Sequence, residues 1–136
     1  MTVSILLVDD DDVARETMIR SLKKNRIDIS VVEAEDGYAA LQILLGNDPH
    51  RSITKPLIVF LDLNMPRMDG FEFLNLVRGN PDIADTVVYV LTTSDSETYL
   101  REAYDKNVAG YLVKSTIGPD FGRLAHLMDT EAIAVD

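Results

Sequence analysis

The sequence predicts an α/β fold: a doubly wound parallel sheet of five strands with helices on both faces. Two observations support this prediction. Apolar runs of strand length alternate with helical segments along the chain, and such alternation is typical of a parallel sheet with crossover helices. The chain also has 136 residues, which is the length of one ordinary domain. We therefore expect a single compact unit.

The expected strands are short apolar runs. The first has no polar residue from Ile5 to Val8, which indicates a strand that is covered on both faces. The run over 57–62 is the most apolar and is expected at the centre of the sheet, whereas the more polar run over 29–34 is expected at an edge. The five expected strands span residues 4–8, 29–34, 57–62, 87–92 and 109–114.

The expected helices follow residues that favour helix N-termini, mostly aspartates. Asp11 or Asp12 can cap the first helix, whose inner face is expected to contain Val13, Met18, Ile19 and Leu22. The five expected helices begin near residues 11–12, 36, 69–70, 95–96 and 119 and end near residues 25, 46, 78, 107 and 128.

Charge and composition limit the classes of partner. The formal net charge is −10, from 23 acidic and 13 basic residues, so the basic surface that binds nucleic acid is not expected. Anionic membrane surfaces would repel the chain for the same reason. The absence of cysteine excludes disulfides and thiolate metal sites. The first apolar run is too short for a signal peptide or a membrane span, and we expect a soluble cytoplasmic protein.

Four of the expected strands end on residues that can bind phosphate or metal. These residues are the pair Asp9 and Asp10, then Asp62, Thr92 and Lys114. In parallel sheets, ligands bind outside the carboxyl ends of the strands, and the strand order 2-1-3-4-5 would place the first and third strands side by side. Carboxylate oxygens suit Mg²⁺, an aspartate can accept a phosphoryl group as an acyl phosphate, and a hydroxyl and an amine can bind its oxygens. The pattern predicts a divalent-cation and phosphoryl site.

Four motifs occur in order: LLVDD at 6–10, DLNMPRMDG at 62–70, LTT at 91–93 and GYLVK at 110–114. Together they resemble the receiver domain of the two-component response regulators, single-domain type, over residues 4–128. The resemblance implies the flavodoxin-like receiver fold with strand order 2-1-3-4-5. It also implies a receiver domain over 1–130, with a flexible C-terminal tail over 131–136.

The resemblance implies a role for each matching residue at the metal. Asp62 would be the phosphoacceptor, which receives the phosphoryl group from a histidine kinase in a Mg²⁺-dependent reaction. Asp10 would bind Mg²⁺ directly and Asp9 through water, and Asn64 would contribute its backbone carbonyl. Because Asn64 stands where aspartyl phosphohydrolases often carry a second carboxylate, and a carboxamide cannot act as a general acid or base, a lasting phosphoryl group is favoured over turnover.

The resemblance also implies a switch. Thr92 would bond a phosphoryl oxygen, Lys114 would ion-pair with the phosphoryl group, and Tyr111 would turn inward as the threonine moves. Two residues depart from the family pattern: Ser115 stands where proline is usual, which puts the shape of that loop in doubt, and Thr93 stands where a smaller residue is common and would narrow access to the site.

Weaker similarities concern the partners. The run over 92–95, together with residues 103–105 and 113–115, resembles stand-alone receivers of phytochrome-type histidine kinases. The implied partners are such a sensor kinase and an unknown downstream or phosphorelay protein. The contact face would consist of the fourth helix, the fifth strand and the fifth helix, which is also a candidate homodimer face, with Tyr99, Leu100 and Tyr104 as contact residues.

Two alternatives stay open. The chain could be an interaction module that works without phosphorylation, which a missing aspartate, threonine or lysine would favour. It could be a Mg²⁺-dependent aspartyl phosphohydrolase, against which Asn64 argues. Finally, the neighbouring acids Asp11 and Asp12 are better explained as helix-capping residues than as ligands.

Overall fold

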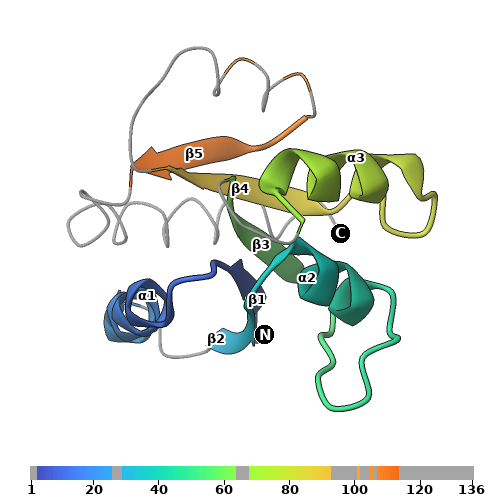
Figure 1. Ribbon diagram of the computed structural model, residues 1–136. Helices are drawn as coiled ribbons and strands as arrows, with labels where there is room; N and C mark the ends of the chain where they lie inside the picture. The colour runs from blue at the N-terminus through green and yellow to red at the C-terminus, as the bar shows by residue number, and fades with distance from the viewer. Residues whose placement is uncertain are drawn as a thin grey trace.

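The computed structural model describes residues 3–25, 29–63, 68–92, 101, 105 and 107–113. Five parallel strands form one sheet in the order β2-β1-β3-β4-β5 (Figure 1). The strands are β1 (Val3–Val8), β2 (Ile29–Ala34), β3 (Leu57–Asp62), β4 (Val87–Thr92) and β5 (Gly110–Val113). The predicted fold class and strand order are confirmed, with β3 at the centre of the sheet and β2 at an edge.

The strand bounds follow the apolar runs closely. Strands β2, β3 and β4 have the predicted bounds, and β1 begins one residue earlier than predicted, at Val3. Strand β5 spans Gly110–Val113, within the predicted 109–114. All six residues of β1 are buried, as expected for a strand covered on both faces.

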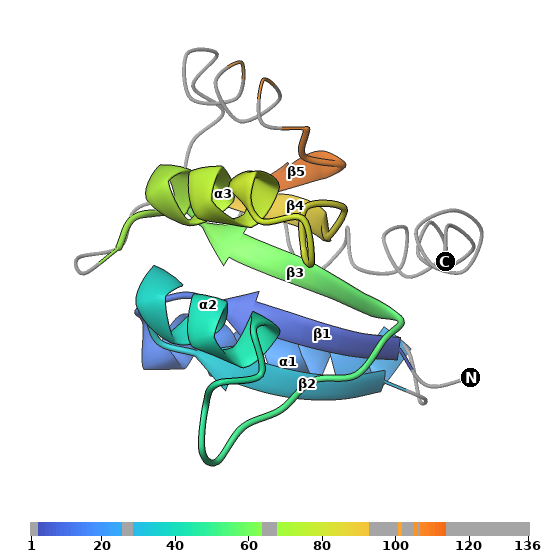
Figure 2. The ribbon, with the colours of Figure 1, turned by 90° about the vertical axis from the view of Figure 1, so that its right-hand side faces the viewer.

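Three helices lie in the part of the chain that the structure describes: α1 (Asp12–Asn25), α2 (Gly37–Leu44) and α3 (Gly70–Gly79). Helices α2 and α3 cover one face of the sheet and α1 covers the other (Figures 1 and 2). The helices predicted over 119–128 and over almost all of 95–107 fall outside the described residues. Among the described residues, no helix has the length and apolar character that a membrane crossing needs.

The helix ends confirm the predicted aspartate caps. The Asp36 carboxylate accepts the Ala39 N–H at 2.8 Å, and the Asp69 carboxylate accepts the Glu72 N–H at 2.9 Å. At the start of α1, Asp11 accepts the N–H groups of two following residues. These bonds satisfy donors that have no partner inside the helix. Each helix therefore begins at a position that its capping aspartate fixes.

Apolar side chains form a core on each face of the sheet. On the side of α2 and α3, the fully buried Phe73 and Leu74 pack against the sheet. On the side of α1, Met18 and Leu22 do so. The placement of Val13 on this inner face is wrong, because its side chain is 70% exposed. At 3.6 residues per turn, the five residues that separate Val13 from Met18 turn it about 140° away from the buried stripe.

Candidate functional site

Three carboxylates meet at the carboxyl end of the sheet. Asp9 and Asp10 follow the end of β1, and Asp62 is the last residue of β3. The parallel register pairs Val8 with Leu61, so the residues that follow in the two strands are neighbours. Carboxylate oxygens of the three aspartates all lie within 4.8 Å of one another. The sequence prediction that these residues come together is confirmed.

The three carboxylates differ in burial. Asp9 is fully buried and Asp62 is 5% exposed, whereas Asp10 is exposed. A buried carboxylate is stable only if hydrogen bonds or a counter-charge compensate for its lost hydration. Oxygen donors from carboxylates, with several positions left to water, are the ligand set that Mg²⁺ prefers. The described donor set therefore fits a divalent cation that is bound by protein on one side and open to solvent on the other.

Backbone and side-chain bonds hold the acidic turn in place. The Asp9 N–H donates to the Ala34 carbonyl of β2 at 3.1 Å. One oxygen of the Asp9 carboxylate accepts the Asp11 N–H at 3.0 Å. The Asp9 carbonyl in turn accepts a hydrogen bond from Arg15 in α1. Asp9 is thus fixed through its N–H, its carbonyl and its side chain.

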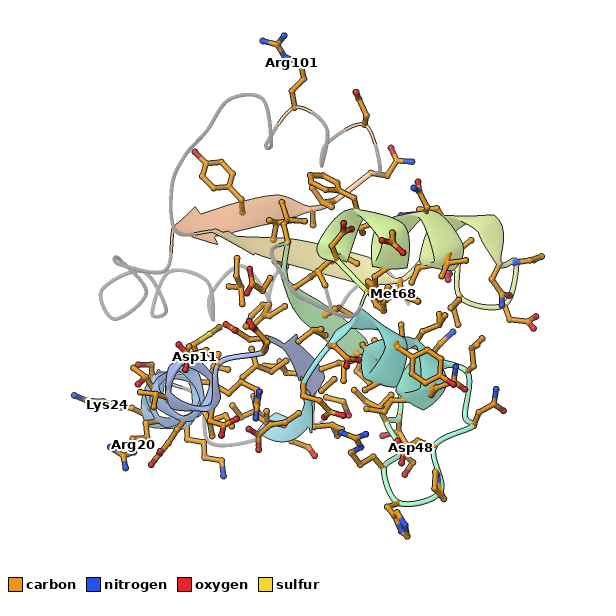
Figure 3. The ribbon with its side chains drawn as sticks, viewed as in Figure 1. Asp11, Arg20, Lys24, Asp48, Met68 and Arg101 are labelled. Atoms are coloured by element: carbon orange, nitrogen blue, oxygen red, sulfur yellow. The ribbon has the colours of Figure 1, made fainter. Side chains whose placement is uncertain are left out.

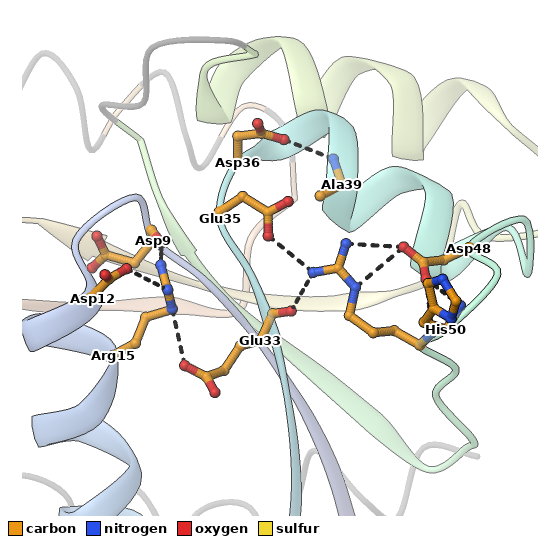
Figure 4. Close-up of polar contacts among 10 residues, drawn as sticks. Asp9, Asp12, Arg15, Glu33, Glu35, Asp36, Ala39, Asp48 and His50 are labelled. Carbon is orange, nitrogen blue, oxygen red and sulfur yellow. Dashed lines mark hydrogen bonds and ion pairs between the residues drawn. The ribbon is translucent and has the colours of Figure 1, made fainter.

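Arg15 joins this turn to the edge strand (Figure 4). Its guanidinium donates to the Asp12 carboxylate at 2.8 Å and to the Glu33 carboxylate of β2 at 3.0 Å, and its side chain is only 12% exposed. Burial lowers the pKa of Arg15, but the hydrogen bonds to Glu33 and Asp12 outweigh this effect and raise its pKa overall. The side chain is therefore a fixed cation with three acceptors.

Two glycines allow the chain after β3 to approach closely. The Gly70 N–H donates to the Leu63 carbonyl at 3.0 Å, and the Gly37 N–H donates to the Met68 carbonyl at 3.3 Å. A Cβ atom on Gly70 would lie 2.7 Å from the Leu63 Cα, and one on Gly37 would lie 2.6 Å from the Met68 oxygen. Both distances are below normal contact, so these positions exclude larger residues. The starts of α2 and α3 therefore hold the two ends of the segment that follows Asp62.

The remaining predicted site residues are described only in part. Thr92 ends β4 and pairs with Val113 of β5, so its backbone lies at the carboxyl end of the sheet. Its side chain lies outside the described part of the structure, as do Asn64 and Lys114 entirely. Tyr111 lies on β5 with its side chain 40% exposed. Their roles stay predictions.

Sequence reasoning missed Arg15 and Gly37. An arginine in the first turns of a helix carries no signal by itself, because exposed arginines are common there. Gly37 did carry a signal. It directly follows the capping residue Asp36 and begins α2, and glycine is unfavourable in a helix. A glycine at that position indicates a close contact from another segment.

The comparison with known proteins identifies the class. The sequence model of the response regulator receiver domain family matches residues 5–123. The chain belongs to this family. Receiver domains act as phosphoacceptor switches and bind Mg²⁺ at an acidic pocket, which agrees with the three clustered aspartates.

The chain is similar to two response regulators, Rcp1 and RcpA. The chain is 36% identical over 111 residues to the response regulator Rcp1 of Synechocystis sp.. The aligned residues are 82% of this chain and 76% of that protein. The crystal structure of the Mn²⁺-bound form of Rcp1 is similar, with a TM-score of 0.77 and 31% identity over 98% of this chain and 96% of that one. The phosphorylated cyanobacterial phytochrome response regulator RcpA has a TM-score of 0.82 and 25% identity over 93% and 94% of the two chains.

Proposed function

We propose that this receiver domain accepts a phosphoryl group on Asp62 from a sensor histidine kinase, in a Mg²⁺-dependent reaction, and signals by conformational change and protein contact. The observation that carries this proposal is the meeting of three carboxylates from two adjacent strand ends. In this proposal the receiver domain extends over 1–130; the predicted tail over 131–136 lies outside the described residues.

In this proposal, each aspartate has its own role at the metal. Asp10 is exposed and binds Mg²⁺ directly, whereas the buried Asp9 acts through a water molecule and Asn64 contributes its backbone carbonyl. Bound Mg²⁺ neutralises negative charge and polarises the phosphoryl oxygens. Support comes from the Mn²⁺-bound form of the relative Rcp1.

The chemistry assigned to Asp62 is a phosphoryl transfer. A carboxylate oxygen of Asp62 attacks the phosphorus, the phosphorus–nitrogen bond of the phosphohistidine breaks, and its electron pair stays on the imidazole nitrogen. The product is an acyl phosphate. The Thr92 hydroxyl and the Lys114 ammonium group bind the phosphoryl oxygens, and Tyr111 reports the change at the surface of β5. The phosphorylated relative RcpA supports this assignment.

The proposed partners follow from the relatives. A phytochrome-type histidine kinase is the proposed phosphoryl donor, since Rcp1 and the phytochrome response regulator RcpA are both similar to this chain. The proposed output face consists of the segment over 95–107, β5 and the segment over 119–128. A downstream protein, a phosphorelay partner or a second copy of the chain binds there.

The test is intact-mass spectrometry after incubation with acetyl phosphate, with and without Mg²⁺. We expect a Mg²⁺-dependent gain of one phosphoryl group that is labile to hydroxylamine. The matched control is Asp62→Asn, which keeps the shape of the side chain and should abolish uptake while the fold is retained. Equal labelling of this variant would contradict the assignment.

If the wild-type chain gains no mass, measurement of released phosphate distinguishes the alternatives. Rapid release would indicate the aspartyl phosphohydrolase. No release would indicate an interaction module that works without phosphorylation.

A further inference from the structure

The Arg15 side chain makes contacts with three segments of the chain. Its Nη1 donates to the Asp9 carbonyl, its Nη2 to the Asp12 carboxylate at 2.8 Å, and its Nε to the Glu33 carboxylate at 3.0 Å. The Asp9 carbonyl belongs to the peptide group that links Asp9 to Asp10. Arg15 therefore bonds directly to the backbone between two of the three clustered aspartates.

We infer that Arg15 is a positioning residue for the metal site: it fixes the peptide between Asp9 and Asp10 against the edge strand β2, and this placement sets the affinity for a divalent cation. The inference rests on the proposed function, since it concerns the cation that the three aspartates would hold. Arg15 itself carries a positive charge and would not touch the metal.

The geometry requires an arginine. Three acceptors that come from the turn, from the start of α1 and from β2 are bonded by three different nitrogen atoms of one planar group. A lysine has a single nitrogen on a flexible chain and cannot reproduce this rigid arrangement. The two carboxylate partners also hold the guanidinium in place, and the side chain is 12% exposed.

Charge and position predict opposite effects when Arg15 is removed. By charge alone, loss of a cation near the aspartates would strengthen binding of Mg²⁺. By position, loss of the hydrogen bond to the Asp9 carbonyl releases the turn and weakens binding. Residues that orient metal ligands without touching the metal typically change affinity by roughly 10-fold or more.

The experiment is calorimetric titration of the full chain with Mg²⁺ alone. We expect the Mg²⁺ affinity of Arg15→Ala to fall about 10-fold and that of Arg15→Lys to fall severalfold, although Arg15→Lys conserves the charge. The matched control is Arg20→Ala on the same helix, which removes the same charge from a side chain that is 78% exposed and pairs with Glu16. Figure 3 shows Arg20 pointing away from the sheet. The Mg²⁺ affinity of this control should stay within twofold of the wild type.

The rate of phosphoryl uptake from acetyl phosphate, measured against Mg²⁺ concentration, gives a second readout. The half-saturating Mg²⁺ concentration should rise in the Arg15 variants, while the rate at saturation changes little. If Arg15 only stabilised the fold, its replacement would lower the melting temperature and leave the half-saturating Mg²⁺ concentration unchanged.

Unchanged or tighter Mg²⁺ binding by a folded Arg15→Ala would overturn the inference. If Arg15→Ala does not fold, unchanged affinity of Arg15→Lys would overturn it. If the wild-type chain itself does not bind Mg²⁺, the proposed function fails and the inference fails with it. If the wild type binds Mg²⁺ and the Arg15 variants bind it with the same affinity, the inference fails and the proposed function stands.

Discussion

Two groups of acidic residues near the carboxyl end of the sheet use their charge in different ways. Asp9, Asp10 and Asp62 bring carboxylate oxygens within 4.8 Å of one another, an arrangement that a divalent cation stabilises. Glu35 and Asp48 instead pair with the guanidinium of Arg51; both acidic residues are labelled in Figure 4. The first group follows two central strands, and the second lies beside the edge strand β2.

The second group carries its counter-charge within the chain. Arg51 pairs with Glu35 and with Asp48, each at 3.0 Å, and also donates to the Glu33 carbonyl at 3.1 Å. Hydrogen bonds to Glu35 and Asp48 raise the pKa of Arg51. Acidity alone therefore does not mark a metal site. What distinguishes the first group is its position at the ends of adjacent strands, where carboxylate oxygens of three residues converge.

The largest expected difference between the groups is the response to Mg²⁺. A ligand that binds only the folded state stabilises it by about 2.7 kcal/mol at 100 times its Kd, so Mg²⁺ at that excess should raise the stability of the wild type by that amount. Asp10→Ala should lose most of this gain, because a direct ligand is removed. Thermal unfolding with and without Mg²⁺, together with calorimetry, provides the measurement.

The control for this prediction is Glu16→Ala, which removes an exposed carboxylate from α1 and should keep the full response to Mg²⁺. An Asp10→Ala variant with unchanged Mg²⁺ affinity would contradict the assignment of the first group as the metal site.

A smaller effect is expected at Gly37, which lies against the segment that follows Asp62. In Gly37→Ala, the new Cβ would lie 2.6 Å from the Met68 backbone oxygen, and overpacking of this kind costs about 1–3 kcal/mol. The matched control is Gly79→Ala in α3, where nothing lies within 4 Å of the new atom. Chemical denaturation should show a loss for the first variant and no loss for the second. Equal stability of the two variants would mean that the segment after Asp62 makes room for the new Cβ without loss of folding free energy.

Most of the fold could be predicted because its signals are local. The apolar runs that form β2, β3 and β4 give their bounds, and the capping aspartates Asp36 and Asp69 mark where two helices begin. Gly46, with a left-handed φ of 76°, follows α2 as the expected helix-stop residue. The wrong placement of Val13 arose at the first turn of a helix, where the phase of the buried stripe is least constrained by other residues.

The site could be predicted only where its residues end strands. Asp9, Asp10 and Asp62 follow from strand order and parallel register. Arg15 could not be found in this way, because its contacts join segments that are distant in sequence and depend on side-chain reach. Gly37 does not end a strand either, and its only signal is its place directly after the capping Asp36. A pattern of residue types contains no information about which carbonyl an arginine will meet.

The smallest expected effect separates the two acidic groups by pH. The hydrogen bond from Arg51 is the main reason why the pKa of Glu35 lies below its ordinary value of 4.5, and the His50 backbone N–H, followed by Arg51, lowers the pKa of Asp48. Carboxyl groups with a lowered folded-state pKa stabilise the fold above their unfolded-state pKa, and this contribution is lost as the pH falls through the lowered value.

Arg51→Met should therefore be less stable than the wild type at neutral pH, and the difference should close as the pH falls below about 4. Because Glu35 is 54% exposed, its pair with Arg51 contributes less than about 1 kcal/mol. Denaturant titrations at pH 7 and pH 3 measure the difference. The Mg²⁺ affinity of this variant at pH 7 should equal that of the wild type, since Arg51 does not contact the turn at Asp9. A constant difference in stability across this pH range would show that Arg51 acts through packing of its side chain and not through its charge.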